Sequence, residues 1–124
     1  MSALPSVAAE NFAQCVPIIA SSELTEGMSH LFTFVKDDER YEAFVIRFGG
    51  QIRAYLNLCP HAGEPIATKN QSAFNSDKRY LLCREHFALF DPDTGKCVSG
   101  PCPIADLHKL SIVQLDGTIC LMMG

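Results

Sequence analysis

The sequence has no hydrophobic run long enough to cross a membrane. The longest candidate covers residues 15–20, whereas a membrane helix needs roughly 20 apolar residues. The first twenty residues also lack the basic start of a signal peptide, and Glu10, Asn11 and Gln14 interrupt their apolar positions. We therefore expect a soluble, cytoplasmic protein that makes no contact with a membrane.

Basic residues are in the minority. Ten lysines and arginines stand against 14 aspartates and glutamates, which gives a formal net charge of −4. Proteins that follow the phosphates of nucleic acids usually carry a basic patch, so nucleic acid is not an expected partner. The chain also lacks a Gly-x-Gly-x-x-Gly segment, so we do not expect it to bind a dinucleotide and oxidise NADH by itself.

The composition is that of one globular domain. Hydrophobic residues make up 48% and charged residues 19% of the 124 positions, far from the composition of a disordered chain. Six cysteines are present. Without an export signal, metal binding or simple burial explains them better than a framework of disulfides.

Short apolar runs separated by turn residues predict an all-β fold. The pairs Gly49-Gly50 and Asp116-Gly117 each separate two such runs, and both are typical of tight hairpins because these residues tolerate positive φ. The expected strands are residues 16–19, 31–35, 41–48, 52–58, 79–82, 88–90, 110–115 and 118–122.

Two stretches are expected to be irregular. Residues 67–78 are rich in asparagine, glutamine and serine and predict an exposed loop, and residues 64–77 leave room for a helical turn. The acidic pair Asp37-Asp38 is expected to form a solvated turn.

Two close pairs of cysteine and histidine, Cys59-Pro60-His61 and Cys83-Arg84-Glu85-His86, carry the strongest chemical signal. Each pair follows a predicted strand, and Pro60 fixes φ where the first loop has to turn sharply. The four side chains suit a tetrahedral zinc, although zinc sites usually pair like residues. They suit a binuclear iron–sulfur centre equally well, because one iron can take both cysteines and the other both histidines.

The spacing C-x-H followed by C-x-x-H resembles the Rieske family, as do the turn Asp91-Pro92-Asp93-Thr94-Gly95 and the loop Gly100-Pro101-Cys102-Pro103. The resemblance covers about residues 21–121. It implies an all-β fold, a Rieske-like antiparallel β-sandwich with a small inserted cluster-binding subdomain at about residues 57–104. The whole chain, residues 1–124, would form one domain with an irregular lead at residues 1–15.

The resemblance also implies the cofactor and its ligands. One [2Fe–2S] cluster would be bound by Cys59 and Cys83 on the buried iron and by His61 and His86 on the outer iron, close to the surface. The Gly-Pro-Cys-Pro loop would cover a third side of the cluster, where Cys102 would line the pocket. Cys15, Cys97, Cys102 and Cys120 are expected to be free thiols.

Two departures from high-potential members indicate a low potential. Glu64 and Glu85 stand where those members carry disulfide cysteines, and Ala88 and Phe90 stand where they carry hydroxyl donors to the cluster. Without these hydrogen bonds the reduced cluster is less stabilised, so we expect a midpoint potential of about −150 mV.

The resemblance therefore implies a soluble Rieske ferredoxin. Such a protein carries one electron at a time, with a flavoprotein reductase as donor and a ring-hydroxylating oxygenase or another oxidoreductase as acceptor. It is an electron-transfer component rather than a catalyst. The terminal oxygenase itself is excluded, because its mononuclear iron needs two histidines and a carboxylate, and only His30 and His108 remain.

Two alternatives stay open at the level of sequence. The first is a Rieske-like small subunit of a larger oxidoreductase such as a nitrite reductase, which would co-purify with its large subunit. The second is a structural zinc module, which would be colourless and contain one zinc ion.

Overall fold

The computed structural model describes residues 15–60, 64–84, 87–100 and 106–123. Within these ranges the chain forms strands and one short 3-10 helix, η1 (Ser21–Glu23). The strands are β1 (Cys15–Ala20), β2 (Ser29–Lys36), β3 (Glu39–Phe48), β4 (Gln51–Leu56), β5 (Leu81–Cys83), β6 (Ala88–Phe90), β7 (Cys97–Ser99), β8 (Lys109–Leu110), β9 (Ile112–Leu115) and β10 (Thr118–Met122).

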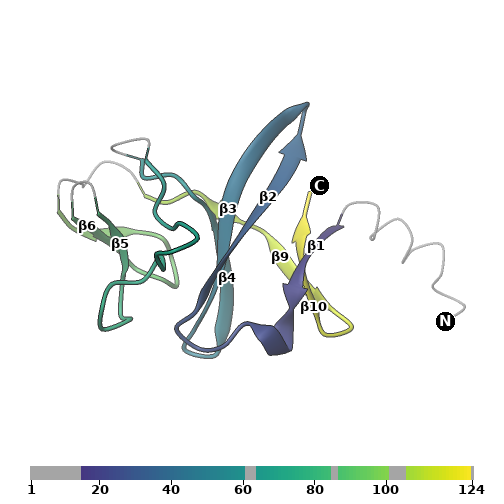
Figure 1. Ribbon diagram of the computed structural model, residues 1–124, viewed down its shortest axis with the longest axis horizontal. Helices are drawn as coiled ribbons and strands as arrows, with labels where there is room; N and C mark the ends of the chain where they lie inside the picture. Colours follow the sequence, from purple (N-terminus) through teal and green to yellow (C-terminus); the bar gives the residue numbers. More distant parts are fainter. Residues whose placement is uncertain (1–14, 61–63, 85–86, 101–105, 124) are drawn as a thin grey trace, which may run out of the picture.

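The strands form three antiparallel sheets, which confirms the all-β prediction. We call them the outer sheet (β1-β10-β9), the central sheet (β2-β3-β4-β8) and the small sheet (β5-β6-β7). The central sheet lies between the other two (Figure 1). No helix in the described ranges is long and apolar enough to span a membrane.

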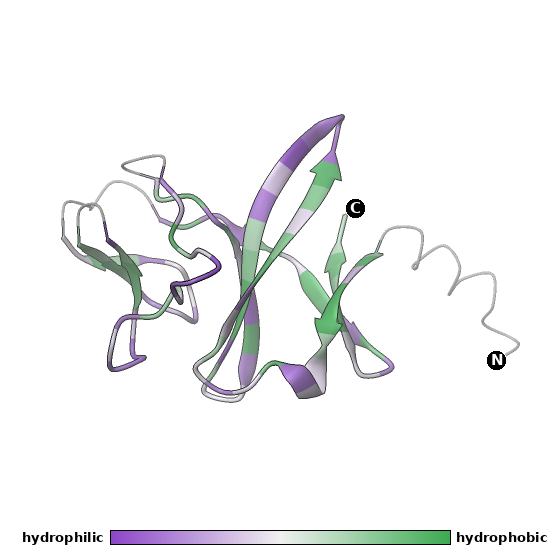
Figure 2. Cartoon of the chain, viewed as in Figure 1, coloured by the Kyte–Doolittle hydropathy of each residue, from purple (hydrophilic) through white to green (hydrophobic). Residues whose placement is uncertain are grey.

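The central sheet is apolar on both faces. Residues 43–46 of β3 are all fully buried, and successive side chains of a strand point to opposite faces. Phe44 and Ile46 therefore pack toward the small sheet, whereas Ala43 and Val45 pack toward the outer sheet. The strands carry most of the hydrophobic residues of the described chain (Figure 2).

The outer and central sheets form the predicted sandwich. Val45 and Ala54 of the central sheet pack with Ile119 of the outer sheet and with Leu24, which follows η1. A neighbouring cluster joins Phe34 to Leu121 across the same interface. All of these side chains are at most 9% exposed, so the two sheets share a continuous apolar interface.

The hairpin turns are those expected from the sequence. Gly49 and Gly50 have φ of +59° and +78°, and Asp116 and Gly117 have φ of +52° and +79°. Positive φ at both central residues is the signature of the tight turn that matches the twist of the two strands.

Several strand boundaries differ from the prediction. β4 ends at Leu56 rather than at residue 58, because the side chain of Asn57 turns inward to bind the backbone of the following loop. The strand predicted at 110–115 is interrupted at Ser111, since β8 pairs with β4 while β9 pairs with β10. β5 begins at Leu81 rather than at residue 79, and β7 was not predicted.

The prediction of an exposed loop at residues 67–78 is wrong for part of that segment. Ala67, Ala73 and Phe74 are at most 2% exposed and belong to the core between the central and small sheets. The segment has no helical turn between residues 64 and 77. The segment is mostly polar, and its few apolar residues do not form the regular spacing of a strand or helix. The sequence therefore did not predict that they are buried.

Candidate metal centre

Cys59 lies on the loop that leaves β4, and its side chain is fully buried. The chain turns sharply there, because the N–H of Leu58 donates to the carbonyl of Leu56 at 2.9 Å. The N–H of Cys59 then donates to the carbonyl of Glu64 at 2.7 Å, which closes the base of the loop. Pro60 is exposed, and His61 lies outside the described residues.

The side chain of Asn57 fixes this first loop from inside. Its Oδ1 accepts hydrogen bonds from the N–H groups of Ile66 and Ala67, both at 2.8 Å, and its Nδ2 donates to the carbonyl of Ala67 at 2.8 Å. Asn57 is only 5% exposed, and a buried amide needs such partners.

Cys83 ends β5 and is also fully buried. The register pairs Cys83 with Ala88 of β6, so the second loop connects two paired strands. Its described end is strained, because Phe87 has a φ of +59°, a conformation that a bulky side chain rarely adopts. Such outliers persist where the surroundings determine them, often at functional sites. His86 lies outside the described residues.

Arg84 fixes the second loop. Its guanidinium donates to the carbonyl of Ser72 at 2.9 Å and to the carbonyl of Phe74 at 3.0 Å. The planar guanidinium suits two carbonyls at once. The loop that follows Cys83 is therefore held against the segment that precedes β5.

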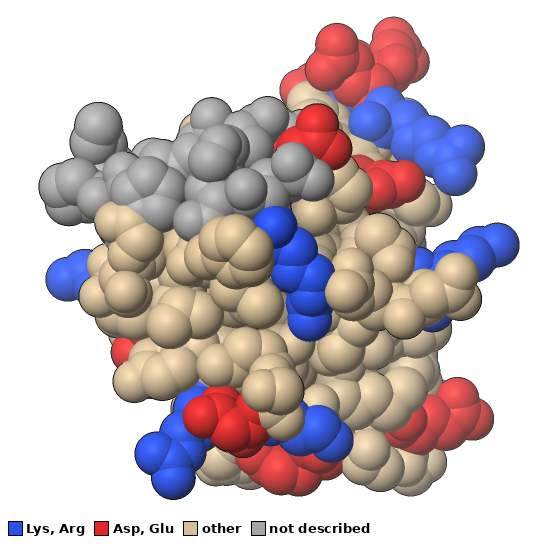
Figure 3. Space-filling model, turned by 60° about the vertical axis from the view of Figure 1, so that its left-hand side comes forward, with Lys and Arg blue, Asp and Glu red and all other residues tan. Residues whose placement is uncertain are grey.

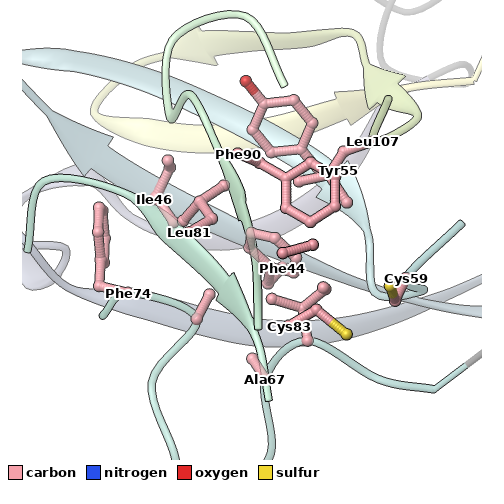
Figure 4. Close-up of a cluster of buried hydrophobic side chains, with 13 residues drawn as sticks. Phe44, Ile46, Tyr55, Cys59, Ala67, Phe74, Leu81, Cys83, Phe90 and Leu107 are labelled. Carbon is pink, nitrogen blue, oxygen red and sulfur yellow. The ribbon is translucent and has the colours of Figure 1, made fainter. Parts of the chain in front are cut away.

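The two thiols lie in one apolar core. Cys59 and Cys83 belong to the same cluster of buried residues, together with Phe44, Phe90 and Leu107 among others. In Figure 4 their sulfur atoms lie at the end of this cluster away from the Tyr55 hydroxyl. Neither cysteine is in a disulfide. The structure thus brings together the two predicted cysteine ligands from loops far apart in sequence.

A third segment closes against the second loop. Gly100, which follows β7, has a φ of +102°, and a Cβ placed there would lie 2.7 Å from the Cα of Ala88 and 3.2 Å from the carbonyl oxygen of Phe87. Only glycine permits this approach. Residues 101–105, including Cys102 and the rest of the predicted covering loop, lie outside the described residues.

The prediction of four free thiols is wrong for Cys97, which is disulfide-bonded. Sequence spacing does not show which thiols meet in space, because the bond depends on Cα separation and side-chain direction. Cys15 and Cys120 are free and buried, as predicted. Burial raises the pKa of the Cys120 thiol, with a further contribution from Cys15. Such a thiol is poorly reactive.

Tyr55 fixes the turn that follows β6. The residue is fully buried, and its hydroxyl donates to the carbonyl of Pro92 at 2.8 Å. Burial raises its pKa well above the usual value near 10. The nearby carboxylates of Asp93 and Asp91 raise it further, and Arg53 opposes them. The phenol therefore stays neutral.

Within the described ranges no three His, Cys, Asp or Glu side chains gather into a metal-binding group. Both predicted histidines lie outside those ranges. The contacts of Asn57 and Arg84 were not predicted, because bonds from a side chain to a distant carbonyl leave no local pattern in the sequence.

The fold and the site define an all-β protein with two cysteine-bearing loops beside one apolar core. The family model that matches this chain is the Rieske [2Fe-2S] domain, over residues 14–113. The chain therefore belongs to the Rieske [2Fe–2S] domain family, and its cofactor is one [2Fe–2S] cluster. A comparison with curated proteins finds no match.

Solved structures share the fold. The ferredoxin of carbazole 1,9a-dioxygenase from Nocardioides aromaticivorans IC177 is 23% identical, with a TM-score of 0.67 over 90% of this chain and 99% of that one. The Sphingomonas yanoikuyae B1 ferredoxin is 18% identical, with a TM-score of 0.67 over 88% and 98%. The terminal oxygenase of carbazole 1,9a-dioxygenase from Novosphingobium sp. KA1 is 19% identical, with a TM-score of 0.71 over 90% of this chain but 30% of that one.

The described part of the site fits the cluster. Iron–sulfur clusters are bound through cysteine thiolates in surroundings that limit contact with water. Cys59 and Cys83 supply two thiols that are 0% exposed in one apolar core, which is the environment such a cluster requires.

Proposed function

We propose that this protein is a Rieske ferredoxin that carries single electrons from a flavoprotein reductase to a terminal oxygenase of the ring-hydroxylating type. The observation that carries the proposal is the extent of the structural likeness. The chain covers 99% and 98% of two ferredoxins, but only 30% of a terminal oxygenase. Another solved structure that this chain resembles is a complex of reduced oxygenase and oxidised ferredoxin in carbazole 1,9a-dioxygenase, which supports an oxygenase as acceptor.

We propose Cys59, His61, Cys83 and His86 as the ligands. When bound, the cluster supplies reversible one-electron chemistry. The two buried thiols would hold the inner iron. His61 and His86 follow these cysteines within the same two loops and would hold the outer iron. The protein's part is to hold the ligands, exclude water and set the potential.

The surface beside the two loops suits a transient protein partner. Leu58, directly before Cys59, is 49% exposed, and Phe87, directly after His86, is 71% exposed. Each of the two loops is thus flanked in sequence by an exposed apolar side chain of the kind that protein interfaces bury. On this side of the molecule most described surface is uncharged, and many charged side chains lie toward its edges (Figure 3). The partners would be redox proteins of the cytoplasm.

Electron paramagnetic resonance tests this proposal. Anaerobically purified protein is measured before and after dithionite reduction, with iron and sulfide assayed on the same sample. We expect a rhombic Rieske signal only after reduction, and equal amounts of iron and sulfide. Cys83→Ser should abolish the signal, whereas Cys120→Ser, which changes a buried thiol of the outer sheet, should retain it.

The other outcomes separate the alternatives. A colourless protein with one zinc ion would contradict the electron carrier and favour a structural module. A cluster-containing protein that purifies only with a large subunit would favour the small-subunit alternative. A loaded protein that purifies alone and passes electrons from a reductase to an oxygenase supports the ferredoxin.

A further inference from the structure

The two cysteine-bearing loops are bonded to one and the same stretch of chain. We call residues 64–75 the connecting segment. Asn57 binds its first half through Ile66 and Ala67, in three hydrogen bonds of 2.8 Å. Arg84 binds its second half through the carbonyls of Ser72 and Phe74, at 2.9 and 3.0 Å.

The connecting segment is itself well fixed. Thr68 and Gln71 bond to each other through both backbone N–H groups, at 2.9 and 3.2 Å, which closes a tight turn between the two halves. The N–H of Ala73 donates to the hydroxyl of Ser29 at 3.0 Å, and its carbonyl accepts from the N–H of Leu82 at 2.9 Å. A segment held at both ends and in the middle can transmit position from one loop to the other.

The segment is also part of the core that holds the thiols. Ala67, Ala73 and Phe74 are buried in the same cluster as Cys59 and Cys83. Every polar contact described for the side chains of Asn57 and Arg84 is to backbone of the connecting segment. Their effect on the cluster would therefore be indirect.

We propose that Asn57 and Arg84 are positioning residues that set the separation of the two cluster loops through the connecting segment. This rests on the proposed cluster site at Cys59 and Cys83. Breaking either attachment frees one loop relative to the other, so the site binds its cluster less tightly and in altered geometry. Changes to residues that orient metal ligands typically lower metal affinity by roughly 10- to 100-fold.

The first test measures cluster release from Asn57→Ala. Oxidised protein is incubated with a chelator, and the loss of visible absorbance gives the release rate. We expect release about tenfold or more faster than in the wild type, with altered g-values in the reduced protein. The matched control is Glu26→Ala, which removes a carboxylate that accepts from the N–H groups of Gly49 and Gly50, at 2.5 and 3.0 Å, in the turn between β3 and β4 and outside the connecting segment.

If Asn57→Ala does not fold, Asn57→Asp takes its place. The carboxylate retains an acceptor for the N–H groups of Ile66 and Ala67 but loses the donor to the Ala67 carbonyl. Its release rate should lie between those of the wild type and a fully broken attachment.

The second test uses Arg84→Gln, with Arg47→Gln as control. Arg47 donates to the carbonyls of Leu24 and Ser21 at 2.6 and 3.0 Å, so its contacts resemble those of Arg84 but lie elsewhere. Arg84→Lys distinguishes the effect of the two hydrogen bonds from the effect of the positive charge. Lysine keeps the charge but lacks the planar guanidinium that bonds to two carbonyls at once. We expect Arg84→Lys to release the cluster nearly as fast as Arg84→Gln.

The double variant tests the coupling between the two attachments. If both side chains act through one connecting segment, breaking the second attachment adds little, so Asn57→Ala with Arg84→Gln should release the cluster at about the rate of the faster single variant. Independent local effects would instead multiply the two rate increases.

The outcomes separate this proposal from the proposed function. A wild-type protein without iron and sulfide contradicts the cluster site itself. A loaded wild type whose Asn57 and Arg84 variants release the cluster like the two controls contradicts only the positioning role. That role is equally contradicted if release increases only in proportion to the loss of unfolding free energy measured for each variant.

Discussion

Replacing Gly100 by alanine should disturb the second cluster loop directly. Gly100 has a φ of +102°, and its new Cβ would lie 2.7 Å from the Cα of Ala88. Carbon atoms in good contact are about 3.5–4.0 Å apart, so the loop or the end of β7 has to move by roughly 1 Å. The atoms nearest to the new Cβ, in Ala88 and Phe87, all belong to the backbone, so no side-chain rotation relieves the overlap.

The expected loss of stability has two parts. A left-handed conformation costs about 1–2 kcal/mol for an L-residue, and overpacking against a fixed neighbour costs about 1–3 kcal/mol more. Gly117→Ala isolates the first part. Gly117 has a φ of +79° but nothing within 4 Å of the added Cβ, so we expect it to lose about 1–2 kcal/mol and to leave the cluster unchanged.

Urea unfolding of both variants gives the two free energies, and electron paramagnetic resonance of the reduced proteins gives the state of the cluster. Gly100→Ala should be about 1–3 kcal/mol less stable than Gly117→Ala and should show shifted g-values or a lower cluster content. Equal stabilities together with identical spectra would refute the argument that the chain after β7 supports the second loop.

Two further predictions concern pH and potential. The raised pKa of Tyr55 means that its contribution to stability is complete below about pH 10 and is lost as pH rises toward the folded-state pKa, because the unfolded chain ionises first. Tyr55→Phe should be about 1 kcal/mol less stable than the wild type at neutral pH, because it lacks the hydrogen bond to Pro92. Above about pH 10, its free energy of unfolding should fall less steeply with pH than that of the wild type. Unfolding curves measured at alkaline pH test this, and parallel declines of the two proteins would contradict it. A redox titration should give a midpoint potential near −150 mV, and a value above zero would show that Ala88 and Phe90 do not lower it.

The sequence predicted the strands well where local rules decide the structure. β6 and β10 have the predicted bounds, and the pairs Gly49-Gly50 and Asp116-Gly117 form the expected turns. The errors in the predicted strand boundaries arise where contacts between residues far apart in sequence determine which strands pair. The break at Ser111 depends on two different partner strands, and the three-residue β7 is defined by its pairing with β6.

The site was predictable to a similar degree. The spacing of Cys59 and Cys83 indicated two ligand loops, and the structure places both thiols in one core. Their supporting contacts could not be foreseen. Asn57 and Arg84 act on carbonyls that are ten or more residues away, and no local pattern predicts such bonds.

The alternation along β3 has a consequence for how this chain responds to substitution. Neighbouring residues of this strand belong to different cores, with Phe44 and Ile46 on the side of the two cysteines and Ala43 and Val45 on the side of the outer sheet. A substitution at Ala43 or Val45 alters the packing against the outer sheet, whereas one at Phe44 or Ile46 alters the core that contains the two cysteines. One strand thus separates two cores, so the packing around the two cysteines and the packing of the scaffold can be altered independently of each other.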